Sequence, residues 1–148
     1  MTASDDPFVR LDGALEEVRR RLRVRLRREL RRRGEYVGGG FPILAQLAAA
    51  GPSSPSELAD QLEVRTSTMA AHLDRLEEAG LIRRTPRDGG GGRVAVHITD
   101  GGAAALGRYV ALRREVLREV LGPLAPDEVR RLAQLLERAL GAGREGEG

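Results

Sequence analysis

The sequence contains no cysteine and no tryptophan, and all 25 of its basic residues are arginine. Without cysteine, the chain can form neither disulfides nor zinc–thiolate sites, and it has no thiol nucleophile or thiol redox sensor. Its two histidines, His72 and His97, are too few for a histidine-rich metal cluster. Aromatic residues make up only 3% of the 148 residues, so the core is expected to be aliphatic.

Long apolar runs are also absent. No stretch approaches the ~18 apolar residues that a membrane-spanning helix needs. The first residues, 1–7, are polar and acidic and are not followed by the apolar segment of a secretory signal. We therefore expect a cytoplasmic protein of one folded domain, since 41% hydrophobic and 32% charged residues provide both a core and a hydrated surface.

The sequence shows no recognisable catalytic constellation. Its acidic residues fall on predicted helix surfaces, and no nucleophile is accompanied by a base and an orienting group. The glycine run 89–92 lacks the Lys-Ser/Thr pair and the following helix of a phosphate-binding loop. We predict a non-enzyme with no cofactor and no metal; a pocket holding strongly perturbed carboxylates would revive the enzyme hypothesis.

Residues 8–34 predict one long amphipathic helix followed by a glycine hinge at 38–40. The arginine-rich surface of this helix permits binding to anionic lipid. Burial of its apolar stripe against C-terminal helices of the same chain and of a partner chain is the simpler interpretation, and we favour it. The stripe consists of Leu11, Leu15, Val18, Leu22, Leu26 and Leu30.

The middle of the chain predicts three shorter helices. The first covers about 42–50. The second begins with a capping box, Ser54-Pro55-Ser56-Glu57, in which Ser54 and Glu57 each bond the other's backbone N–H. The third runs from about 67 to 79, ends at Gly80, and carries an inward stripe of Met69, Leu73 and Leu76.

A β-hairpin follows these helices. Residues 81–85 and 93–99 predict two strands, with Val94, Val96 and Ile98 alternating along the second, and a glycine loop joins them. The order helix, turn, helix, hairpin is that of a winged helix-turn-helix. The predicted fold is mainly α with a small β-hairpin wing, flanked by long dimerisation helices. Its segments are a disordered 1–7, a dimerisation helix 8–34, the winged domain 40–99, dimerisation helices 100–141, and a disordered tail 142–148.

Small polar residues open the third short helix, as a helix that enters a DNA major groove requires. The hairpin is expected to bring its arginines, including Arg83, to one edge beside the DNA backbone. Other interpretations remain open: helix capping for Ser67 and Thr68, a pair with Glu78 for Arg75, and plain surface charge for the hairpin arginines. The candidate DNA-binding residues are Arg65, Thr66, Ser67, Thr68, Ala71, Arg75, Arg84, Arg87 and Arg93.

The stretch from Ser54 to Asp88, SPSELADQLEVRTSTMAAHLDRLEEAGLIRRTPRD, and the block VHITDGGAAAL at 96–106 resemble the MarR family of dimeric bacterial transcription regulators. The resemblance implies that 66–75 is the recognition helix. It also implies that Arg84 and Asp88 are the charged positions at the wing base. The sequence departs from the family at the wing, where Asp88 is followed by Gly89, Gly90, Gly91 and Gly92 in place of an early arginine. Arg93 or Arg87 would then take the tip position.

The resulting hypothesis is a homodimeric regulator, expected to be a repressor, that binds a pseudo-palindromic operator in double-stranded DNA. The resemblance further implies release by a small aromatic or phenolic ligand. Tyr36 and Phe41 flank the glycine hinge and are the candidate ligand-binding residues. The alternative is a protein-interaction adaptor that kept the winged fold and lost specific DNA binding, which the glycine wing favours.

Overall fold

The computed structural model describes residues 6–89 and 91–142. The ends predicted to be disordered, 1–7 and 142–148, fall mainly on residues 1–5 and 143–148, which lie outside those ranges. The elements are α1 (Pro7–Arg32), α2 (Phe41–Ala50), α3 (Pro55–Gln61), α4 (Thr66–Glu78), β1 (Ile82–Pro86), β2 (Val94–Ile98), α5 (Asp100–Val120) and α6 (Pro126–Ala142). This confirms the predicted mainly α fold with a β-hairpin.

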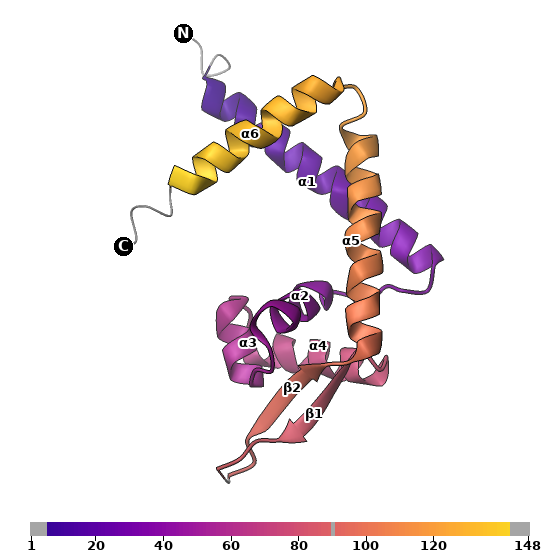
Figure 1. The fold of residues 1–148 in the computed structure, drawn as a ribbon, viewed down its shortest axis with the longest axis vertical. Coiled ribbons are helices and arrows are strands. Elements are labelled where there is room, and N and C mark those ends of the chain that lie inside the picture. Colours follow the sequence, from indigo (N-terminus) through magenta and orange to yellow (C-terminus); the bar gives the residue numbers. More distant parts are fainter. Residues whose placement is uncertain (1–5, 90, 143–148) are drawn as a thin grey trace. The chain divides into compact units, whose positions relative to one another are not determined.

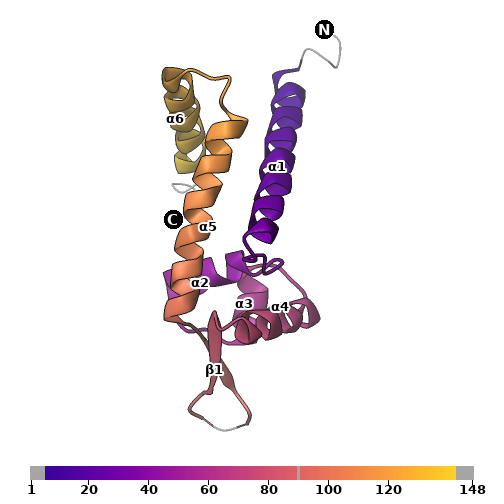
Figure 2. The same ribbon diagram turned by 90° about the vertical axis from the view of Figure 1, so that its right-hand side faces the viewer.

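The chain packs as two units. One unit, here called the winged unit, is Leu26–Arg113, and the other takes in the described parts of Met1–Arg25 and Arg114–Gly148. In the winged unit α2, α3 and α4 cluster together, and the hairpin extends from them (Figure 1). Figure 2 shows α4 near the base of the hairpin, whose tip points away from the helices. The recognition candidates and the wing therefore belong to one compact body.

The core of the winged unit is aliphatic apart from Phe41, in line with the shortage of aromatics in the sequence. Each of its helices and both strands contribute side chains that are almost fully buried. A short bridge between Ser53 and Val96, with N···O distances of 3.2 and 2.8 Å, ties the hairpin to the α2–α3 connection. The largest side chains that are less than 2% exposed are Ile43, Leu44, Leu47, Leu58, Met69, Leu73, Leu76 and Val96.

Local sequence signals set the ends of these elements. The predicted capping box is present: Ser54 Oγ accepts from the Glu57 N–H at 3.1 Å, and Glu57 Oε2 accepts from the Ser54 N–H at 3.0 Å. Gly80, with φ of 75°, follows the end of α4. Thr99 caps α5 by accepting from the Gly102 N–H at 3.0 Å, and its hydroxyl donates to the Gly80 carbonyl at 2.7 Å. Thr99 thus joins the start of α5 to the end of α4.

The apolar stripe of the long N-terminal helix becomes more buried along the helix, from the exposed Leu11 and Leu15 through the half-buried Val18 and Leu22. Of the six stripe residues only Leu26 and Leu30 are buried. Large exposed apolar side chains also lie on α5, on α6 and in the turn between them. Within the described residues, no helix is long and apolar enough to cross a membrane. The exposed apolar residues are Phe8, Val9, Leu11, Leu15, Val24, Val110, Leu117, Leu124, Val129, Leu135, Leu136 and Leu140.

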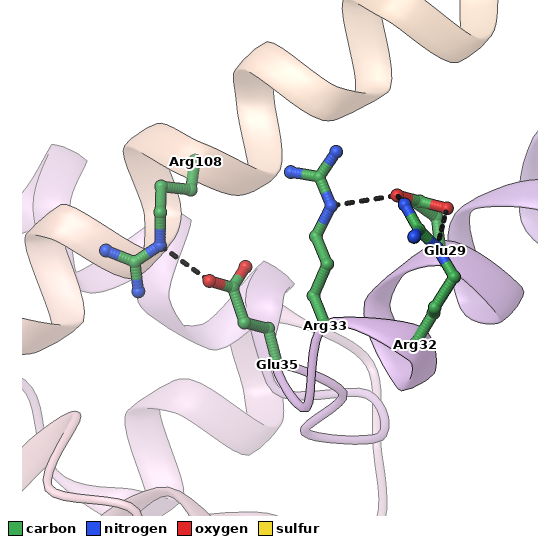
Figure 3. A network of polar contacts seen from close by, with 5 residues as sticks. All are labelled: Glu29, Arg32, Arg33, Glu35 and Arg108. Atoms are coloured by element: carbon green, nitrogen blue, oxygen red, sulfur yellow. Dashed lines mark hydrogen bonds and ion pairs between the residues drawn. The ribbon is translucent and has the colours of Figure 1, made fainter.

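Ion pairs cover the polar surface of α1 and its C-terminal end. Glu17 accepts hydrogen bonds from Arg20 and Arg21 at 2.8 and 2.6 Å. Near the end of the helix, Glu29 accepts from Arg32 and Arg33, and Arg108 of α5 donates to Glu35 at 2.8 Å (Figure 3). Many α1 arginines therefore serve helix stability and end anchoring.

These pairs predict a loss of stability in acid. Hydrogen bonds from Arg20 and Arg21 lower the pKa of Glu17 to about 2, and those from Arg32 and Arg33 lower the pKa of Glu29 to about 2. A carboxylate whose pKa is lower in the folded state stabilises the fold above its ordinary pKa, 4.5, and loses that contribution as the pH falls towards 2. The helical circular dichroism signal should fall across this window. A Glu17→Gln, Glu29→Gln double variant should show a smaller change, and an equal change in both proteins would contradict the assignment.

Candidate nucleic-acid interface

Helix α4 has one buried side and one open side. Met69, Leu73 and Leu76 are buried in the winged unit. Ser67 and Ala71 lie on the opposite side of the helix and are exposed. The open side carries small side chains near its start, so a second macromolecule can approach the helix backbone closely there.

The N-terminal turn of α4 has the chemistry of an anion- and base-binding surface. Arg65 is the N-cap residue, with extended φ and ψ of −66° and 147°, and its side chain makes no capping hydrogen bond. Thr66, Ser67 and Thr68 follow, all exposed. The first turn contains no acidic residue. Free backbone N–H groups and hydroxyls at a helix N-terminus favour phosphate and can donate to base edges.

Arg75 lies further along α4 and points toward the connection between α1 and α2. A Cβ atom added to Gly38 would lie 2.6 Å from Arg75 Nη1, and one added to Gly39 would lie 3.0 Å from the His72 ring. A Cβ added to Gly40 would lie 2.6 Å from the Leu76 side chain. The predicted glycine hinge is thus a surface on which α4 packs. No Arg75–Glu78 ion pair occurs among the described residues, so that alternative is not supported.

The two strands of the wing present different residues on their two faces. β1 and β2 are antiparallel, with Arg83 opposite His97 and Arg84 opposite Val96. Successive residues of a strand point to opposite faces. The expectation that the hairpin arginines share one edge is therefore wrong for this pair: Arg83 lies on the outer face with Thr85, and Arg84 lies on the inner face with Val96.

Arg84 is turned toward α4, where it meets acidic side chains. Its guanidinium lies 2.8 Å from Asp74 and 3.8 Å from Glu77, and its side chain is 28% exposed. Asp74 lies on the open side of α4. Arg84 therefore compensates a negative charge that would otherwise repel phosphate at the candidate interface. Sequence reasoning missed this role, because no short spacing signals a pair ten residues apart.

Arg87 also has a partner inside the protein. Its Nη1 lies 3.2 Å from Glu57 Oε1, so the capping-box residue of α3 also contacts the wing. In contrast, Arg83 and Arg93 are exposed and form no ion pair within the described residues. Asp88 is exposed as well. No observation tests the prediction that Arg84 and Arg87 contact DNA, and for Arg87 the pair with Glu57 favours a role within the protein instead.

The aromatic residues predicted to bind a ligand differ in accessibility. Phe41 is 4% exposed and stacks on Tyr109, with ring centroids 4.1 Å apart and an interplanar angle of 9°. Tyr36 is 37% exposed, and the Arg31 guanidinium lies 4.8 Å from its ring centroid. Phe41 thus belongs to the core of the winged unit, whereas Tyr36 is open to a ligand.

No metal site is visible in ranges 6–89 and 91–142, because no three of their His, Asp and Glu side chains gather closely enough to hold an ion. Asp74, Glu77 and Glu57 near the candidate interface face arginines, and Glu57 also accepts from a backbone N–H. For Glu57 the backbone N–H of Ser54, and then Arg87, lower its pKa. This keeps the carboxylate charged, which is the opposite of what a general acid requires.

Comparison with known proteins gives consistent results. Residues 40–89 match the sequence model of the MarR family. The transcriptional regulator PecS of Dickeya dadantii is 39% identical over 101 residues, which make up 66% of this chain and 61% of PecS. The curated relatives PecS, NicR and MdtR are thus matched over 61%, 63% and 60% of their own length.

Solved structures are similar over most of the chain. The apo form of MarR from Escherichia coli is 27% identical with a TM-score of 0.75, and the match covers 88% of this chain and 96% of that one. A mutant MarR from the same organism, complexed with operator DNA, is 28% identical with a TM-score of 0.66. That match covers 90% of this chain and 95% of the DNA-bound one. The winged helix-turn-helix fold predicted from the sequence is confirmed.

Proposed function

The chain belongs to the MarR family, and from that premise we propose that it is a sequence-specific DNA-binding transcriptional regulator that acts as a repressor. The observation that carries the proposal is the open N-terminal side of α4, which joins exposed hydroxyls to a helix N-terminus free of acidic residues. Under this proposal the protein acts in the cytoplasm, where operator DNA lies, and it catalyses no reaction.

Helix α4 enters the major groove by its N-terminal turn. Thr66, Ser67 and Thr68 donate to phosphates and base edges, and Ala71 leaves room for close approach. Arg65 at the N-cap lies beside the DNA backbone, and Arg75, whose guanidinium lies against Gly38 in the free protein, turns from there to a phosphate. The wing reaches the neighbouring minor groove with Arg93, which is exposed and has no ion-pair partner in the described residues.

A homodimer provides two such helices. The exposed apolar side chains of α1, α5 and α6 exceed what a small monomer normally leaves in water, and a second copy would cover them. Two recognition helices related by a twofold axis read half-sites about 34 Å apart, one turn of B-DNA. A pseudo-palindromic operator follows from that symmetry.

A small aromatic or phenolic ligand releases the DNA in this proposal by favouring a dimer whose recognition helices have a different spacing. Tyr36 is the accessible contact, and a ligand that reached Phe41 would have to displace Tyr109. Operator binding measured with and without benzoate or phenol tests this step. The ligand should lower the operator affinity of the wild-type protein, and this loss should disappear in Tyr36→Ala. An equal response in that variant removes Tyr36 from the ligand site.

The proposal is tested by titrating the full chain with the DNA upstream of its own gene at several salt concentrations. We expect preference for one sequence and a log–log salt slope of about −0.9 for each phosphate contacted. Arg93→Ala should make the slope shallower by about 0.9 per protomer, and Arg75→Ala should weaken operator binding. Arg130→Ala is the control, because Arg130 is an exposed arginine paired with Asp127 on α6, outside the winged unit.

Three outcomes are informative. Weakening by both variants supports readout by helix and wing together. Weakening by Arg75→Ala alone leaves the wing without a phosphate contact. Weak binding that is equal on all DNA contradicts the proposal and favours the protein-interaction adaptor.

A further inference from the structure

Glu57 has contacts in two parts of the winged unit. Its Oε2 accepts from the Ser54 backbone N–H at 3.0 Å and thereby completes the capping box of α3. Its Oε1 accepts from Arg87 Nη1 at 3.2 Å. One carboxylate oxygen is therefore held by the helix cap, and the other faces the wing.

Arg87 lies at the end of the paired strands, where the loop of the wing begins. It directly follows β1, and its backbone N–H donates to the Arg93 carbonyl at 2.8 Å. Beyond it, Gly89, Gly91 and Gly92 have positive φ, and a Cβ added to any of them would meet nothing within 4 Å. Open space surrounds these positions, so a side chain placed there would find nothing to pack against.

A groove of about 420 Å³ separates the wing from the start of α3. The groove is open, so packing does not fix the distance between its two walls beyond the Ser53–Val96 backbone bridge beside Ser54. Of the ion pairs in the described residues, the pair between Glu57 and Arg87 is the one that spans it. The walls consist of Ser54, Pro55, Ser56 and Glu57 on one side and Arg87, Gly92, Arg93 and Val94 on the other.

We propose that Glu57 is a wing-positioning residue that, by pairing with Arg87, withholds Arg87 from DNA phosphate and so favours operator over non-specific DNA. This inference rests on the proposed function. Both side chains are about half exposed, 46% for Arg87 and 47% for Glu57, so the pair contributes little to overall stability. The strands of the wing are held by their buried side chains, but the loop beyond Arg87 has several orientations of similar energy, and a weak interaction is enough to select one.

The withheld charge matters for specificity. Phosphate contacts carry no sequence information, and each one adds to binding on every DNA. A free Arg87 would add one such contact per protomer. Removal of the Glu57 charge is therefore expected to strengthen non-specific binding more than operator binding.

Glu57→Gln separates the two roles of this residue. Glutamine at the third helical position also completes a capping box, so the start of α3 is retained and the thermal midpoint should stay unchanged. The neutral amide no longer holds Arg87. We expect the salt slope on non-operator DNA to steepen by about 0.9 per protomer, so that the loss of affinity between 50 and 200 mM salt grows roughly threefold per protomer.

Arg87 variants supply the matched controls. Arg87→Gln should leave the wild-type salt slope unchanged, because the paired Arg87 neutralises no phosphate. The Glu57→Gln, Arg87→Gln double variant should return to the wild-type slope. Arg87→Lys keeps the ion pair and should behave as wild type, whereas a merely structural effect of Glu57 would change stability without changing the slope.

A measurement without DNA keeps the inference separate from the proposed function. Hydrogen–deuterium exchange of the full chain should be faster at the Arg87 amide in both Glu57→Gln and Arg87→Gln, and normal in Arg87→Lys. A slope that becomes shallower by about 0.9 in Arg87→Gln, or unchanged exchange in both glutamine variants, would overturn the proposal. Wild-type protein that binds no DNA would refute the proposed function, and the exchange data would still decide whether Glu57 positions the wing.

Discussion

Ser67→Asp is expected to weaken operator binding about 100-fold while slightly stabilising the fold. Ser67 is exposed on the open side of α4, so a carboxylate there would face phosphates in the proposed complex. Loss of a groove contact costs about 1.5 kcal/mol per protomer, which for two protomers gives about 3 kcal/mol, or about 100-fold. The first turn of α4 has no acidic residue, and an aspartate near a helix N-terminus contributes about 0.5 kcal/mol to stability.

The opposite signs of these two effects make the test specific. Binding is measured by titration at constant salt, and stability by thermal denaturation. Ser67→Asn is the matched control because it has nearly the same shape as aspartate without the charge, and it should cost less than tenfold in affinity. Wild-type affinity in Ser67→Asp would mean that the start of α4 does not face DNA.

Gly102→Ala is expected to lower the free energy of unfolding by about 3 kcal/mol. Gly102 is buried in the first turn of α5, and a methyl group on it would overlap the carbonyl oxygen of Leu81. Backbone on both sides of this contact cannot move aside as a flexible side chain could. The added Cβ would also lie 2.9 Å from the Ile98 side chain of β2. The clash would therefore separate α5 from the base of the hairpin.

Gly107→Ala on the same helix provides the control with the opposite sign. No atom lies within 4 Å of a Cβ added at Gly107, so alanine there gains helix propensity and should raise the free energy of unfolding by about 0.5 to 1 kcal/mol. Both variants are compared with wild type by urea denaturation. Equal stability of Gly102→Ala and wild type would contradict the close approach of α5 to Leu81.

Local signals in the sequence were sufficient for most of the fold. The capping box at Ser54, the glycine at the end of α4 and the alternation of Val94, Val96 and Ile98 each involve residues within four positions of one another. Thr99 caps α5 through a bond to a residue three positions away, but its second bond, to the Gly80 carbonyl, is a long-range contact. The predicted order of elements and the family resemblance depend on such local patterns.

The candidate site was predicted less completely. The open side of α4 follows from helical periodicity, since Met69, Leu73 and Leu76 define the buried side. The acidic partners of Arg84 and Arg87 could not be predicted from periodicity. Each of these ion pairs joins two elements, and a sequence pattern does not specify how two elements are placed relative to each other. Phe41 was predicted to meet a ligand, and in the structure Tyr109 covers it.

By itself, the sequence determined the helices, the hairpin, the absence of cysteine chemistry and the polar start of α4, because hydrogen bonds and periodicities within a few residues fix these features. Only the tertiary structure decided which wing arginines are paired with carboxylates and which are free in the described residues. It also decided that Gly38–Gly40 forms a surface for α4 rather than a simple hinge. These properties depend on distances between elements, which arise only when the core of the winged unit packs.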